Sequence, residues 1–113
     1  MDLYTELELK LSSLDKSVKM LRKTGEAYAL AEKDYKIALR QECLKLRDEG
    51  TAIGIISLTC YGIPSIAELR FKRDVAESIY KANIESINVL KLELRLIEGQ
   101  INREYGISGK GDI

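Results

Sequence analysis

The sequence predicts an all-α protein: an antiparallel two-helix hairpin of the coiled-coil type that assembles into a helical bundle as a homo-oligomer. Apolar residues recur in alternating steps of three and four along two long, highly charged stretches, the pattern of helices with a buried seam. One glycine-rich break, residues 50–64, separates them. Both stretches also carry a second apolar row, which a single pair of helices cannot bury. The whole chain is expected to form one domain.

The first helix is expected over residues 3–49. Its seam consists of Leu3, Leu7, Leu11, Leu14, Val18, Leu21, Tyr28, Ala31, Tyr35, Ala38 or Leu39, and Leu46. Gly25 takes the next seam position after Leu21. Because glycine inside a helix costs about 1 kcal/mol relative to alanine, Gly25 indicates either a bend or close helix crossing, or a tolerated weak position.

The connection is expected over residues 50–64, where glycines and Pro64 interrupt the helical pattern. Ser65 and Glu68 then fit a capping box, which would start the second helix at residue 65. The connection is too apolar for a simple solvated turn, and it predicts a partner-binding tip. Alternatively, it forms a short helical turn that closes the end of the core. The tip residues are Ile53, Ile55, Ile56, Leu58 and Tyr61.

The second helix is expected over residues 65–105, followed by a flexible tail at 106–113. Its seam consists of Leu69, Ala76, Tyr80, Asn83, Ile87, Leu90, Leu94, Ile97, Ile101 and Tyr105. Asn83 is the polar member of this row. Such a residue can fix helix register, but drift of the seam into solvent is the interpretation we favour.

Self-association is expected because the second apolar rows would otherwise stay exposed, and a dimer of hairpins would bury them in a four-helix bundle. The second rows are Leu9, Met20, Ala27, Leu30, Ile37 and Leu44, and Val75, Ile79, Ala82, Val89, Leu92 and Leu96. The seam residues expected to carry the association are Leu14, Val18, Leu21, Tyr28, Tyr35, Ile87, Leu90, Leu94 and Ile97.

The composition predicts no catalytic, cofactor or metal site, and we expect no enzyme. The chain has no histidine, and its two cysteines, Cys43 and Cys60, have no metal-ligand spacing. They favour a reduced, cytoplasmic setting over a disulfide framework. The acidic N-terminus is unlike a signal peptide, and the apolar run at 51–66 is too short to span a bilayer, so no membrane partner is expected.

A nucleic-acid-binding accessory protein is the alternative function. If the chain folds back near Ser57, residue i faces about residue 114 minus i, which would bring Lys91 and Arg95 to the level of the basic residues on the first helix. The resulting patch is Lys16, Lys19, Arg22, Lys23, Lys91 and Arg95. A formal net charge of zero and interleaved acidic residues favour an ordinary solvated face instead.

The segment at 69–82 contains Leu69-Arg70, then Arg73-Asp74-Val75-Ala76-Glu77, Tyr80 and Ala82. It resembles small uncharacterised helical proteins of temperate phages and prophages of Gram-positive bacteria. The resemblance covers roughly the middle third of the chain. It implies a phage-type accessory protein in the host cytoplasm that binds another protein, such as a replication, recombination or host-defence component. It implies no catalytic residue.

Overall fold

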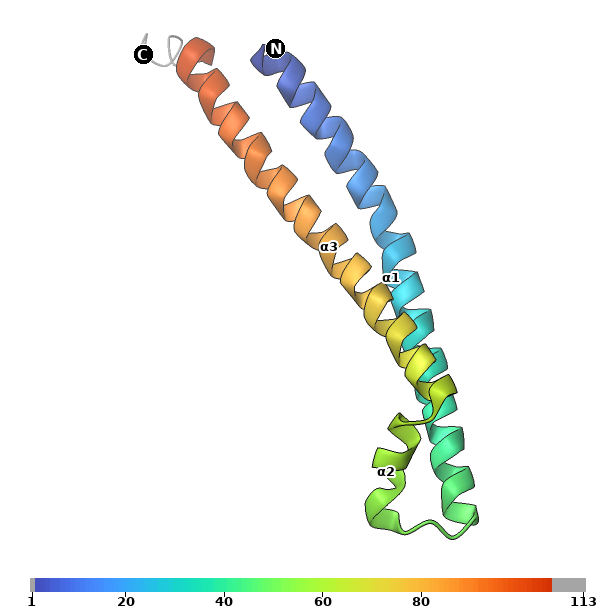
Figure 1. Cartoon of the computed structure of the whole chain (residues 1–113). Coiled ribbons are helices and arrows are strands. Elements are labelled where there is room, and N and C mark those ends of the chain that lie inside the picture. The colour runs from blue at the N-terminus through green and yellow to red at the C-terminus, as the bar shows by residue number, and fades with distance from the viewer. Residues whose placement is uncertain (1, 107–113) are drawn as a thin grey trace. The chain divides into compact units, whose positions relative to one another are not determined.

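The computed structural model describes residues 2–106, and this part of the chain is helical, with no strand (Figure 1). The elements are α1 (Leu3–Asp48), α2 (Ile53–Tyr61), α3 (Pro64–Ile101) and a π-helical turn, η1 (Asn102–Gly106). The predicted all-α class is confirmed. The predicted tail begins at Gly106, which is the last residue of η1. The rest of the predicted tail lies outside the described residues.

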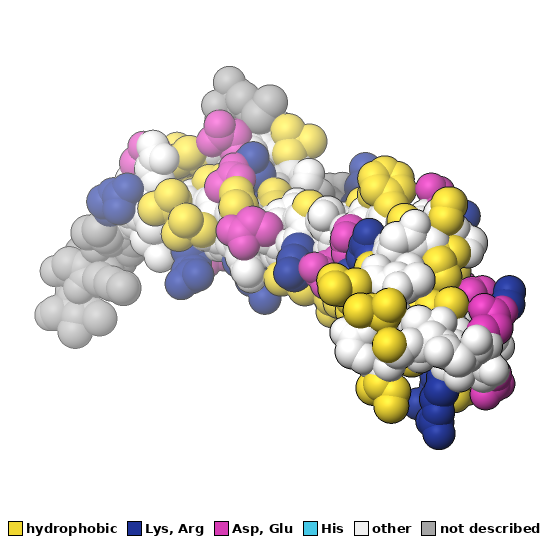
Figure 2. Space-filling view, turned by 60° about the horizontal axis from the view of Figure 1, so that its bottom comes forward, with side chains coloured by type: hydrophobic (Ala, Val, Ile, Leu, Met, Phe, Trp, Pro, Cys, Tyr) yellow, Lys and Arg dark blue, Asp and Glu magenta, His cyan; other side chains and the backbone are white. Residues whose placement is uncertain are grey.

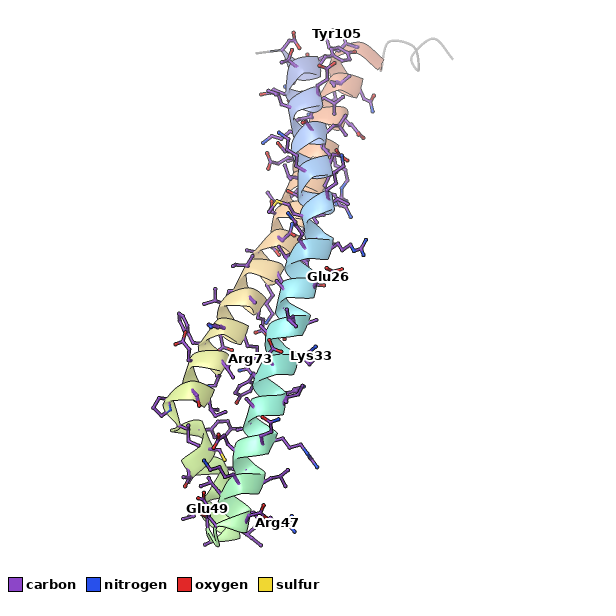
Figure 3. The ribbon with its side chains drawn as sticks, turned by 90° about the vertical axis from the view of Figure 1, so that its right-hand side faces the viewer. Glu26, Lys33, Arg47, Glu49, Arg73 and Tyr105 are labelled. Carbon is purple, nitrogen blue, oxygen red and sulfur yellow. The ribbon has the colours of Figure 1, made fainter. Side chains whose placement is uncertain are left out.

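Two compact units make up the chain. The terminal unit combines Met1–Arg22 with Ala82–Ile113, and the central unit is Lys23–Lys81. The start of α1 lies antiparallel to the end of α3 in the terminal unit. The ring of Tyr105, which is labelled in Figure 3, lies 5.8 Å from that of Tyr4. Lys10 forms an ion pair with Glu93, and Asn83 contacts α1. In the central unit, α2 and the start of α3 pack against the second half of α1.

Polar residues take part in the inner row of the terminal unit. Asn83 is buried beside Ile87 and Leu90, and its Nδ2 donates to the carbonyl of Ser17 at 2.9 Å. The expectation that Asn83 is solvated is therefore wrong. The three-four spacing keeps Asn83 in phase with Ile87, and the hydrogen bond offsets the cost of burying its amide.

The predicted seam of α1 is partly out of phase. Leu11 and Val18 are about half exposed (48% and 49%), whereas Lys10 and Ser17 face α3. Val18 is thus wrongly placed in the predicted seam. Steps of three and four fit both a row that contains Leu11 and Val18 and a row that contains Lys10 and Ser17. Here the ion pair and the amide hydrogen bond occupy the inner row, so the apolar neighbours turn outward.

Gly25 lies at a close approach between α1 and α3. A Cβ atom built on it would lie 3.2 Å from Cε1 of Tyr80, whose ring is 6.0 Å from that of Tyr28. The neighbouring Thr24 takes the buried position. Of the two interpretations of Gly25, the structure supports the close helix contact.

Backbone capping ends α1 as the glycine pattern indicates. Gly50 has φ 87°, its N–H donates to Arg47, and the N–H of Thr51 donates to Leu46 at 3.0 Å. This is a Schellman motif, in which glycine adopts the left-handed conformation at little steric cost. At the other end, Asp2 caps α1 by accepting from the N–H of Thr5 at 2.7 Å.

The start of α3 differs from the predicted capping box. Pro64 is the first helical residue, and the carbonyl of Ile63 accepts the helical hydrogen bond from the N–H of Ala67 at 2.9 Å. Ser65 is therefore already inside the helix and is not the N-cap. Proline suits this first position because its missing N–H would have no partner in the helix and its φ is already helical.

The chain reverses earlier than predicted. It turns between α1 and α2, at residues 49–52, and α2 then lies beside the end of α1, within contact of Cys43 (Figure 1). The predicted fold-back near Ser57 is wrong, because Ser57 lies inside α2. The register differs accordingly: Lys10 pairs with Glu93, which is about three helical turns before residue 104, the position predicted to lie opposite Lys10.

Candidate interaction surfaces

The predicted tip forms an exposed apolar surface on a helix. The side chains of Ile53, Leu58, Ile55 and Tyr61 are 85%, 75%, 51% and 43% exposed, and we call these four the tip surface. Ile56 is half-buried. Figure 2 brings the part of the chain that contains α2 forward and shows hydrophobic side chains gathered there. The connection is therefore helical, as one interpretation holds, yet most of its apolar side chains face solvent.

Cys60 and Tyr61 connect the end of α2 to α1 and α3. Cys60 is fully buried, and its Sγ lies 3.0 Å from Sγ of Cys43 on α1. Arg70 of α3 donates to the carbonyl of Tyr61 at 3.4 Å and lies over its ring, 5.4 Å from the centroid. The N-cap residue, Ala52, offers no side-chain hydrogen bond. Cys60 is thus the buried side chain of α2.

A second apolar surface runs along the central unit. Leu30, Ile37 and Leu44 on α1 are spaced by seven residues, so they share one side of that helix. They are about half exposed, as are Val75 and Ile79 on α3. These five residues belong to the second rows that the sequence predicts, and we call them the groove face.

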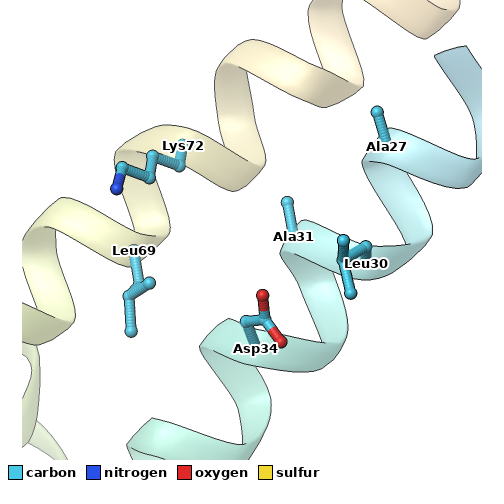
Figure 4. A pocket seen from close by; sticks show the side chains of 6 residues that line it. All are labelled: Ala27, Leu30, Ala31, Asp34, Leu69 and Lys72. Carbon is cyan, nitrogen blue, oxygen red and sulfur yellow. The ribbon is translucent and has the colours of Figure 1, made fainter.

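A groove between α1 and α3 opens beside the groove face (Figure 4). It has a volume of about 210 Å³ and is lined by Ala27, Leu30, Ala31, Asp34, Leu69 and Lys72. Most of its lining is apolar. Asp34 on α1 and Lys72 on α3 are its charged members, one of each sign. Ala27 and Ala31 have small side chains, which leave space between the two helices.

A polar cluster fixes α1 against α3 close to this groove. The hydroxyl of Tyr28 donates to Glu77 at 2.6 Å, and Lys81 donates to the same carboxylate at 3.2 Å. The hydrogen bond to Glu77 is the main cause that raises the pKa of Tyr28 to about 12. The same bond, followed by that from Lys81, lowers the pKa of Glu77. Because the groove lies between helices held in this way, it is preformed.

Arg73 adds a further cross-helix contact. Its guanidinium lies 4.5 Å from the centre of the Tyr35 ring, between α3 and α1 (Figure 3). It also forms an ion pair with Asp74 at 2.9 Å, whose carboxylate is the main cause that raises the pKa of Arg73. Tyr35 is the buried aromatic ring of the central unit. Such a cation–π contact is worth about 0.5–2 kcal/mol, depending on burial.

The residues of the predicted basic patch do not form the expected girdle. Lys19 pairs with Asp15 at 2.9 Å, and Lys91 and Arg95 flank Glu93, which pairs with Lys10. Lys91 and Arg95 therefore lie at the level of Lys10 and not at that of Lys16, Lys19 and Arg22. Lys23 belongs to the central unit. The earlier reversal of the chain is the reason.

The other predicted seam residues point inward to different degrees. Tyr35, Ile87, Leu90 and Leu94 are buried. Leu14, Leu21, Tyr28 and Ile97 are half-buried. The Cys43–Cys60 pair was not predicted, because the two thiols are 17 positions apart in the sequence and only the return of α2 along α1 brings them together.

Comparisons add no further assignment. No family model, curated protein or solved structure matches the chain. The resemblance to phage-encoded helical proteins therefore stays a prediction. Within residues 2–106 no group of three or more acidic, cysteine or histidine side chains is placed to hold a metal ion. None of the helices described has the length and apolar character needed to cross a membrane.

Proposed function

We propose that the chain is a helical hairpin that forms a homodimeric four-helix bundle through its groove face and acts as a non-enzymatic protein–protein interaction module. The observation that carries the proposal is the exposed groove face with its preformed apolar groove. Under this proposal a second copy covers the groove face, and the tip surface stays available to a different protein, as in the phage-type accessory role that the resemblance implies.

The small interior of the single chain supports self-association. Within residues 2–106 only six apolar side chains are buried, whereas twenty large apolar side chains are exposed. Burying a Leu, Ile or Val side chain contributes about 1.5–3 kcal/mol, so exposing whole rows of them forgoes much of the stabilisation available to a small protein. Covering the groove face recovers part of it.

A second copy suits the groove face for two reasons. The same seven-residue spacing that lines up Leu30, Ile37 and Leu44 allows side chains of one copy to enter the groove of the other. In a two-fold arrangement with α1 of one copy against α3 of the other, Asp34 would face Lys72 of the second copy, and the reverse pair forms at the same time. A formal net charge of zero adds no overall repulsion.

The test is the solution mass of the full chain at micromolar concentration, measured by light scattering and sedimentation. We expect the mass of two chains, and that of one chain for Leu30→Glu combined with Ile79→Glu, with helicity retained. Leu58→Glu is the matched control, because it puts the same charge on the tip surface and should leave the dimer intact. A single-chain mass for the fully helical wild type would refute the proposal.

A charge exchange tests the arrangement itself. Asp34→Lys should weaken the dimer by leaving two lysines opposed across the interface, and adding Lys72→Asp should restore it. Because each pair occurs twice in a two-fold dimer, a coupling of about 0.5 kcal/mol per exposed pair contributes twice to the free energy of dissociation. Equal dissociation constants for the single and double variants would rule out this pairing.

A further inference from the structure

Cys43 and Cys60 form a pair of thiols that no step of the proposed function uses. Cys43 lies on α1 and is half-buried, and Cys60 lies on α2 and is fully buried. Their Sγ atoms are 3.0 Å apart within the central unit. A disulfide bond is about 2.0 Å long, so a closure of about 1 Å would join the two helices covalently.

We propose that Cys43 and Cys60 are a redox site, at which exchange with a low-molecular-weight disulfide such as oxidised glutathione forms an intramolecular disulfide that fixes α2 to α1. The site goes beyond the proposed function, because its chemistry requires neither a dimer nor a partner protein.

The exposure of the two thiols sets the order of the steps. Cys43 is the one that solvent reaches, so its thiolate attacks one sulfur of the added disulfide, and one glutathione thiolate leaves. The product is a mixed disulfide at Cys43. Cys60 then gives up its proton, its thiolate attacks Sγ of Cys43, and the second glutathione leaves as a thiolate that takes up a proton. Two protein thiols are oxidised and one glutathione disulfide is reduced to two thiols, so atoms and electrons balance.

The second step requires the thiolate of Cys60. Burial is the main cause that raises the pKa of Cys60 to about 11, and the thiol of Cys43 and the charge of Glu42 add to it. These two groups of α1 face Cys60, and α2 itself carries no charged side chain. From α3, Arg70 contacts the neighbouring residue, Tyr61. Because the thiolate is the nucleophile, closure should accelerate about tenfold per pH unit between pH 7 and 10.

The consequence of closure concerns the tip surface. Reduced α2 is held by the buried Cys60 side chain and by Arg70 at its last residue. A disulfide adds a covalent tie one residue earlier, closing a loop that contains the whole of α2 up to Cys60. Local opening of α2 away from α1 is then prevented, so oxidation fixes the positions in which Ile53 and Leu58 are exposed.

The experiment treats the full chain with oxidised glutathione and follows its intact mass. We expect loss of two hydrogen atoms without retained glutathione. Trypsin should then release peptide 41–45 linked to peptide 48–70 until a reductant separates them, because Arg40, Lys45, Arg47 and Arg70 bound these peptides. Hydrogen exchange of the α2 amides should slow on oxidation.

Two variants separate the roles of the thiols. Cys60→Ser should trap the mixed disulfide at Cys43, whereas Cys43→Ser should stay unmodified because Cys60 is sealed. Should serine at the buried position unfold the chain, Cys60→Ala provides the same test. A wild type that retains glutathione, links two chains, or gives no linked 41–45 and 48–70 pair would overturn the proposal. So would equal modification of the two single variants.

Discussion

Gly50 and Gly54 lie four residues apart, and replacing them with alanine is expected to have opposite effects. Gly50 has a left-handed φ of 87° in the motif that ends α1, whereas Gly54 lies inside α2 with no atom within 4 Å of a built Cβ. An alanine is strained at the first position and favoured at the second. Backbone conformation, not sequence context, distinguishes the two.

We predict that Gly50→Ala lowers the free energy of unfolding by about 1 kcal/mol. Gly54→Ala should instead stabilise α2 by up to about 1 kcal/mol. Urea unfolding followed by circular dichroism measures the first effect, and hydrogen exchange of the α2 amides measures the second. A loss of stability in both variants would contradict this assignment of their backbone conformations.

Tyr28 and Glu77 predict a dependence on pH. The pKa of Tyr28 is raised from 10.0 to about 12, so its contribution to folding is complete below pH 10 and is lost as pH rises through 12. The pKa of Glu77 is lowered from 4.5, so its contribution is present above pH 4.5 and is lost as pH falls through the lower value. The pair therefore stabilises the fold most between these limits.

The measurement is a titration of tyrosinate absorbance. Of the six tyrosines, Tyr28 should ionise near pH 12, and Tyr28→Phe should remove this late phase. Glu77→Gln removes the negative acceptor and should return the phase toward pH 10. A late phase that survives Tyr28→Phe would assign the raised pKa to another tyrosine.

Residues of the inner row show where the sequence pattern misleads. Lys10 and Asn83 lie inward because each finds a polar partner across the helices, while Val18 lies outward. A binary pattern of apolar and polar residues cannot anticipate such pairs, since the partner comes from the other helix. Ile87, Leu90 and Leu94 were predicted from their unbroken three-four spacing, and all three are buried.

At the scale of elements, α2 is the one that the sequence leaves open. Its residues show neither a polar face nor a helical stripe, and the glycines and Pro64 predict a break. The end of α1 and the start of α3 were predicted to within one residue because Gly50 and Pro64 mark them locally, whereas α3 ends at Ile101, four residues before the predicted end. The helix between them depends on α1, whose side supplies the site for Cys60.

We predict that buried and exposed residues near α2 differ sharply in their effect on stability. Ile66 at the start of α3 is 1% exposed, so Ile66→Ala should cost about 2–5 kcal/mol in thermal or urea unfolding. Ile53→Lys combined with Leu58→Lys should change the unfolding free energy by less than about 0.5 kcal/mol.

The lysine pair should also reduce the fluorescence of an added hydrophobic dye, because it removes the most exposed apolar side chains of the tip surface. Serine in place of the exposed Thr59 is the control for α2 itself. A large loss of stability in the lysine pair would show that these side chains are covered in solution.

At the scale of the whole molecule, the proposed dimer couples folding to concentration. We predict that the thermal midpoint of the wild type rises with protein concentration, because dimerisation removes folded monomers from the unfolding equilibrium. The midpoint of Leu30→Glu with Ile79→Glu should be lower and should not change on tenfold dilution. Differential scanning calorimetry at several concentrations makes the comparison, and a wild-type midpoint that ignores dilution would count against the dimer.

The second apolar rows could be predicted from the sequence, because they depend only on helical spacing. The groove, whose lining includes Ala27 and Ala31 as well as Asp34 and Lys72, was not predictable. It depends on the register of α1 against α3, which the early reversal at residues 49–52 sets.

The tip surface has one thermodynamic consequence. Residues 51–67 contain no lysine, arginine, aspartate or glutamate, so a complex formed through α2 alone releases few counterions. Its affinity should vary little with ionic strength. The burial of isoleucine and leucine should instead appear as a negative heat-capacity change in calorimetry.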